Sequence, residues 1–84
     1  MIKVYHAKDL TEQKFPDDYE LVALVETDNL DHAFELTNTF DMPWWEKDGV
    51  RCLKETRSTS VGDVLEFKGK LFRCENAGWS EINE

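Results

Sequence analysis

Glycine divides the second half of the chain into apolar segments that are too short for ordinary helices. Gly62, Gly69 and Gly78 each fall at a turn signal, and the segments beside them mix apolar and polar residues in strand-like fashion. At Lys68-Gly69 the glycine suits the positive-φ position of a tight hairpin. The pattern predicts a C-terminal β-meander with short strands at residues 50–54, 63–67, 70–75 and 79–82.

Two further strands are predicted in the first half. Residues 2–7 alternate, with Ile2, Val4 and His6 on one side. Residues 20–26 are apolar throughout their middle, which is typical of a strand that is covered on both faces.

A single amphipathic helix is predicted from about residue 29 to residue 40. Asn29 ends a run of N-cap residue types, and apolar side chains recur at helical spacing from Leu30 to Phe40. Pro43 cannot continue this helix. We therefore expect one α+β domain over residues 1–84, in which the amphipathic helix packs on a small, mostly antiparallel sheet of about five strands. The predicted core contains Ile2, Val4, Leu21, Ala23, Val25, Leu30, Ala33, Phe34, Phe40, Val64, Leu65, Phe67, Phe72 and Trp79.

The charge of the chain is uneven. The net charge is −8, and residues 1–48 hold 12 Asp and Glu against 4 Lys and Arg, whereas residues 49–84 hold 6 of each kind. Direct nucleic-acid binding is not expected, because it needs clustered Lys and Arg that neutralise phosphates. The acidic half suits a basic partner, and the alternative is that it only keeps the protein soluble.

Location and ligands are constrained mainly by what the sequence lacks. It holds no apolar run of about 18 residues and no secretory leader, so we expect a cytoplasmic protein without membrane attachment. The soft metal ligands are Cys52, Cys74, His6 and His32, and none of their spacings is that of a zinc site. Neither a metal nor another cofactor is expected.

No catalytic motif stands out. Ser58, Thr59 and Ser60 are nucleophiles by type only, without a nucleophile elbow or an adjacent histidine. The glycines form no phosphate-binding loop. An enzyme is therefore not expected.

Two clusters are candidate binding residues. In the loop at Trp44 and Trp45, one indole is expected in the core and the other at a binding surface; the alternative is that both pack on the sheet. The other cluster is Arg57, Ser58, Ser60 and Asp63. Here Arg57 pairs with Asp63 or binds an acidic group, and the alternative is a purely structural role.

The second cluster also resembles a known group of proteins. Residues 57–64 read RSTSVGDV, followed by glycine at 69, Gly-Trp at 78–79 and isoleucine at 82. This resembles a pattern, RSxSVGDV…G…GF…I, of small proteins encoded by bacteriophages and plasmids, including the YodL-like domain. Residues 36–38 and 43–45 are similar as well, and Trp79 stands where the pattern usually has phenylalanine. The resemblance implies no catalytic residues, and it implies an accessory role inside a bacterium.

The expected function is therefore that of a small acidic accessory protein that binds a host or phage protein in the bacterial cytoplasm. One alternative is an acidic nucleic-acid mimic that inhibits a host DNA-binding enzyme. A small enzyme is another. A homodimer formed through exposed strand edges also stays open.

Overall fold

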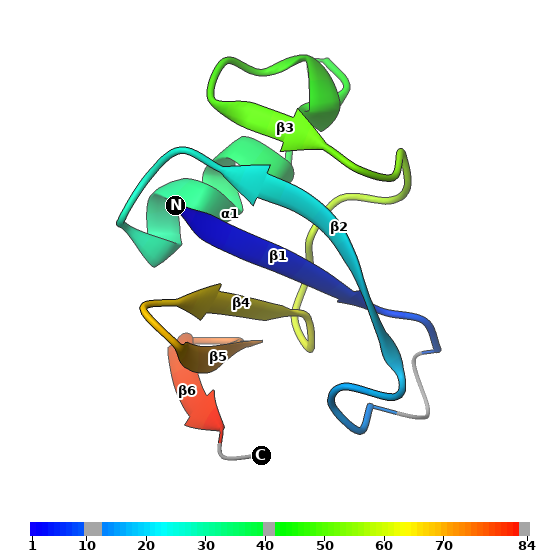
Figure 1. Ribbon diagram of the computed structural model, residues 1–84, viewed down its shortest axis with the longest axis vertical. Coiled ribbons are helices and arrows are strands. Elements are labelled where there is room, and N and C mark those ends of the chain that lie inside the picture. Colours follow the sequence, from blue (N-terminus) through cyan, green and yellow to red (C-terminus); the bar gives the residue numbers. More distant parts are fainter. Residues whose placement is uncertain (10–12, 40–41, 83–84) are drawn as a thin grey trace.

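The computed structural model describes residues 1–9, 13–39 and 42–82. They form one antiparallel six-stranded sheet in the order β3-β2-β1-β4-β5-β6, with one α-helix on one face (Figure 1). The elements are β1 (Ile2–Ala7), β2 (Tyr19–Val25), α1 (Leu30–Thr37), the 3-10 helix η1 (Trp44–Glu46), β3 (Val50–Cys52), β4 (Val64–Phe67), β5 (Lys70–Glu75) and β6 (Gly78–Ile82). The predicted α+β fold is confirmed, and so is a C-terminal meander of β4, β5 and β6. The placement of residues 50–54 in this meander is wrong, because β3 pairs with β2 at the opposite edge of the sheet. Among the described residues, no helix combines the length and the apolar character that crossing a bilayer requires.

The helix begins where predicted and ends earlier. Asn29 is its N-cap, and the Asn29 side chain accepts a hydrogen bond from the backbone N–H of His32 at 3.0 Å. At the other end the Thr37 carbonyl accepts from the N–H of Thr59, and the Asn38 amide donates to the Thr59 carbonyl. These contacts with a distant loop replace further helical bonds, so the extension toward residue 40 is wrong. Phe40 itself lies outside the described residues.

A β-bulge in β2 corrects the predicted core. Val4 pairs with Ala23 but Tyr5 pairs with Leu21, so Val22 is the extra residue. Val22 and Ala23 are consequently both buried, and Leu21 turns outward with 36% of its surface exposed. The prediction of Leu21 as a core residue is therefore wrong.

The two faces of the sheet carry separate apolar clusters. The main cluster lies on the helix side and is built from Ile2, Val4, Val22, Ala23, Val25, Ala33, Trp44 and Leu65. A second cluster joins Ala7, Phe15, Tyr19 and Val64. Five predicted core residues are only half-buried: Leu30, Phe34, Phe67, Phe72 and Trp79.

The two cysteines are free and stand far apart in the sheet. Cys52 is in β3 and Cys74 is in β5, with β2, β1 and β4 between them. Four strand spacings of about 4.8 Å separate them by on the order of 19 Å. A disulfide needs Cα atoms within about 7 Å, so the native fold holds these thiols apart.

Candidate protein-binding groove

The motif at residues 57–63 is organised by an ion pair. The Arg57 guanidinium donates to both carboxylate oxygens of Asp63, from Nη1 to Oδ2 at 2.7 Å and from Nη2 to Oδ1 at 2.8 Å. This is the two-pronged geometry that makes an arginine–carboxylate pair strong. The Asp63 carboxylate is buried, with 1% exposed, and bonding to it raises the pKa of Arg57.

The same pair extends the pairing of β1. Strand β4 pairs with β1 only as far as Tyr5. Beyond it, the Ala7 N–H donates to Asp63 Oδ1 at 2.9 Å, and the Ala7 carbonyl accepts from Arg57 Nη2 at 3.0 Å. Two side chains thus satisfy the backbone groups that a longer β4 would have satisfied.

Ser58 and Ser60 form hydrogen bonds within the same loop. The Ser60 N–H donates to Asp63 Oδ2 at 2.8 Å, and the Ser58 carbonyl and the Ser60 hydroxyl accept from Arg57. Gly62 has a φ of +97°, and a Cβ there would meet the Gln13 side chain at 3.0 Å. The four predicted residues therefore lie together, with contacts inside the loop and to β1.

His6 and Thr59 complete the buried side of this loop. His6 Nε2 lies 2.8 Å from Thr59 Oγ1 and 3.9 Å from Asp63 Oδ2, and His6 Nδ1 has no hydrogen-bond partner among the described residues. Burial lowers the pKa of His6 to about 4; the charge of Asp63 opposes this shift and that of Arg57 adds to it. Since His6, Thr59 and Asp63 are all buried, they present no surface to a substrate.

We expect the protein to lose roughly 3 kcal/mol of stability through His6 when the pH falls from 7 to 4. The unfolded imidazole binds a proton near pH 6.5, whereas the folded one does so only near pH 4. The stabilisation is therefore complete above pH 6.5 and is lost as the pH falls toward 4. Urea unfolding at pH 7, 5.5 and 4 measures this loss. The His6→Gln variant should show a shallower pH dependence; an equal dependence in both proteins would contradict the assignment.

The adjacent tryptophans differ in burial, as one of the two alternatives predicted. Trp44 is 2% exposed and belongs to the main core, where its Nε1 donates to the Thr56 carbonyl at 3.0 Å. Trp45 is half-buried and packs edge-on against Trp44, with ring centroids 5.6 Å apart. The two lie in the 3-10 helix η1 rather than in an extended segment.

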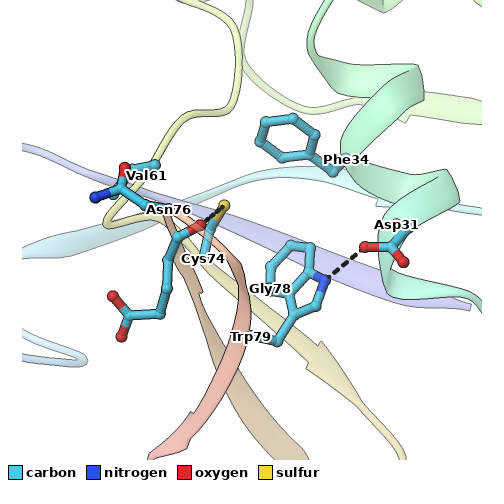
Figure 2. A pocket seen from close by; sticks show the side chains of 8 residues that line it. Asp31, Phe34, Val61, Cys74, Asn76, Gly78 and Trp79 are labelled. Atoms are coloured by element: carbon cyan, nitrogen blue, oxygen red, sulfur yellow. Dashed lines mark hydrogen bonds between the residues drawn. The ribbon is translucent and has the colours of Figure 1, made fainter.

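A groove lies between the helix, the loop and the last hairpin. It encloses about 250 Å³ and is lined by Asp31 and Phe34 from α1, Val61 from the loop, Cys74 and Glu75 from β5, Asn76 from the turn, and Gly78 and Trp79. Figure 2 shows the Phe34 ring and the Trp79 indole on opposite sides, with Val61 and Cys74 between them at the far end. Of the predicted site loop, only Val61 reaches this groove, with 49% of its surface exposed.

One hydrogen bond sets the width of the groove. Trp79 Nε1 donates to Asp31 Oδ1 at 2.9 Å and so ties β6 to the first turn of α1 (Figure 2). Phe34, one helical turn after Asp31, meets Trp79 edge-on, with ring centroids 6.3 Å apart and an interplanar angle of 77°. The prediction of Trp79 as a core residue is thus replaced by a role as a wall of the groove.

The groove is electrically negative. Asp31 and Glu75 are its charged members, and among the described residues that line it none is Lys, Arg or His. Burial raises the pKa of the Cys74 thiol, and the charges of Asp63, Glu75 and Asp31 raise it further. The thiol therefore stays protonated at neutral pH and serves as a small apolar group.

The lining of the groove is apolar at its walls and acidic at its margin. Within residues 1–9, 13–39 and 42–82, no three His, Cys, Asp or Glu side chains gather closely enough to hold a metal ion. The groove offers aromatic and aliphatic contact area at its walls and carboxylates at its margin. Sequence reasoning missed it because its members come from distant segments; the only local signal is the i, i+3 spacing of Asp31 and Phe34.

Comparison of the chain with protein-family models, with curated proteins and with solved structures finds no match.

Proposed function

We propose that this chain is a small accessory protein that acts by binding another protein, and that the groove beside Trp79 forms part of the contact. The single observation behind this is a half-open site whose walls are Phe34, Val61 and Trp79. Aromatic side chains with accessible faces are the residue type that contributes most at protein interfaces. Partly exposed apolar walls with a polar margin match the anatomy of such interfaces.

The resemblance of residues 57–64 supports a more specific setting. A phage- or plasmid-encoded protein would find its partner, a host or phage protein, in the bacterial cytoplasm. The net charge of −8 favours a basic partner, since opposite charge speeds association and disfavours acidic competitors.

The nucleic-acid mimic is the weaker proposal. A mimic needs carboxylates in a row at phosphate-like spacing. Three acids of the first half each make a contact within the chain at the surface: Asp18 accepts from the Lys14 N–H, Glu20 pairs with Lys54, and Asp31 accepts from Trp79. No specific observation favours the mimic over a protein-binding groove.

Two matched variants test the proposal by affinity capture from bacterial lysate. Val61→Arg places a bulky charged side chain in the groove. Leu53→Arg introduces the same side chain just after β3, at the opposite edge of the sheet from the groove. The two side chains are equally accessible, at 49% and 48% exposed, so both variants should fold. We expect a partner that the wild-type protein and Leu53→Arg retain and that Val61→Arg loses at least tenfold, which corresponds to about 1.4 kcal/mol.

Two outcomes would speak against the proposal. If the wild-type protein captures no protein, the proposed partner does not exist. If Val61→Arg and Leu53→Arg capture the partner equally well, the groove does not contact it. Thermal unfolding of both variants shows whether the fold is intact.

A further inference from the structure

The groove combines an apolar interior with an acidic margin, and a ligand that matches both has an apolar stem and a positively charged end. We propose that it binds one arginine or lysine side chain of the partner protein. The aliphatic stem lies against Phe34, Val61 and Trp79, and the cationic end lies beside Asp31. This inference rests on the proposed function and names the chemistry that the same site recognises.

The size of the groove fits a single side chain. Its volume of about 250 Å³ is below the roughly 300–1,000 Å³ of pockets that take drug-sized ligands. Its apolar walls are the two aromatic rings and Val61, with the protonated Cys74 thiol behind them. A long methylene stem would cover such walls, as Lys and Arg stems do on other apolar surfaces.

The carboxylate of Asp31 is already oriented for a cation. Its Oδ1 accepts the Trp79 indole N–H at 2.9 Å, and its Oδ2 has no hydrogen-bond partner among the described residues. The indole bond holds the carboxylate at the margin of the groove, which lowers the conformational cost of pairing with a ligand.

The charge around the groove favours a cation over a neutral side chain of equal length. Glu75 adds a second carboxylate to the margin, and the described lining contains no opposing positive charge. The negative potential reaches the interior, since the charges of Asp63, Glu75 and Asp31 contribute, after burial, to the raised pKa of Cys74. An acidic side chain would meet repulsion from the same groups.

Titration with three small probes tests the inference. The probes are Nα-acetylarginine amide, Nα-acetyllysine amide and Nα-acetylnorleucine amide, which share a backbone and differ in the end of the side chain. The readout is the NMR signal of the Trp79 indole N–H. We expect millimolar dissociation constants for the two cationic probes, about fivefold tighter than for the norleucine probe at low salt and less so at high salt.

A matched pair of charge-removing variants isolates Asp31. Asp31→Asn keeps an oxygen that accepts the Trp79 indole bond and removes the charge. Glu35→Gln removes the same charge one turn further along α1, from an exposed residue that does not line the groove. We expect Asp31→Asn to raise the dissociation constant of the arginine probe about fivefold and to leave that of the norleucine probe unchanged. Glu35→Gln should change neither dissociation constant by more than about twofold.

Three results would overturn the inference: equal affinity for the norleucine and arginine probes, equal effects of Asp31→Asn and Glu35→Gln, or no response of the Trp79 signal to any probe. The capture experiment fails separately. If Val61→Arg loses a captured partner while the norleucine probe binds as well as arginine, the protein-binding function stands and the cationic ligand does not. If the arginine probe binds through Asp31 but no partner is captured, the site stands and the proposed function does not.

Discussion

Replacing Asp63 with asparagine should lower the free energy of unfolding by about 3 kcal/mol. The buried carboxylate accepts from the N–H groups of Ala7 and Ser60 and twice from Arg57. An asparagine accepts through only one of its two end atoms, so its NH2 group would face two donors. Breaking a buried ion pair costs about 3–5 kcal/mol. We take the lower end because the Arg57 side chain is 37% exposed and recovers water when it loses its partner.

Urea unfolding followed by fluorescence measures this effect, and a double-mutant cycle assigns it. Arg57→Met alone leaves a buried carboxylate without its charge partner. The double variant Arg57→Met/Asp63→Asn should then cost much less than the two single variants together. Strict additivity, or a loss below about 1 kcal/mol for Asp63→Asn, would mean that the pair does not hold the loop. A domain of this size has on the order of 4–13 kcal/mol in total, so the expected loss is a large share of it.

Truncating Trp44 to alanine should cost about 4 kcal/mol, whereas truncating Trp45 should cost less than about 2 kcal/mol. Trp44 is 2% exposed and surrounded by the main core, so its removal leaves a cavity. It also leaves the Thr56 carbonyl without the indole N–H. Trp45 is only half-buried, so water replaces part of what its ring contacts.

Far-UV circular dichroism during urea unfolding suits this comparison, because both variants lose an indole fluorophore. Trp44→Phe separates the two contributions: it keeps most of the packing and should cost about 1–2 kcal/mol for the lost hydrogen bond. A larger loss for Trp45→Ala than for Trp44→Ala would show that the assignment of core and surface indole is reversed.

The sequence was a good guide to the fold where a local pattern decides the structure. All six segments predicted as strands form strands, so the sheet has six strands rather than about five. Alternation and turn glycines act over a few residues, and β1 has the predicted bounds 2–7. The helix start was equally local, since the Asn29 side chain caps it within one turn. The end of the helix was not, because Thr59, some 20 residues later, donates to the Thr37 carbonyl and accepts from the Asn38 side-chain amide.

The candidate site was harder to predict, and for a similar reason. The Arg57–Asp63 pair spans six residues and was among the predicted alternatives, but its attachment to Ala7 spans 50 or more. The groove depends on a bond between residues 48 positions apart, Asp31 and Trp79. Leu21 points outward because β2 contains one extra residue. A bulge of this kind cannot be predicted from a continuous apolar run, since the apolar pattern is the same with and without it.

The position of β6 at the edge of the sheet has a consequence for how the groove behaves. Among the described strands, β6 pairs only with β5, so it can separate from the sheet by local opening while β1, β2 and β4 keep their pairing. Such an opening would carry Trp79 away from Asp31 and abolish the groove without unfolding the domain. The affinity of the groove and the local stability of the β5–β6 hairpin are therefore coupled, and a ligand that fills the groove also holds β6 in place.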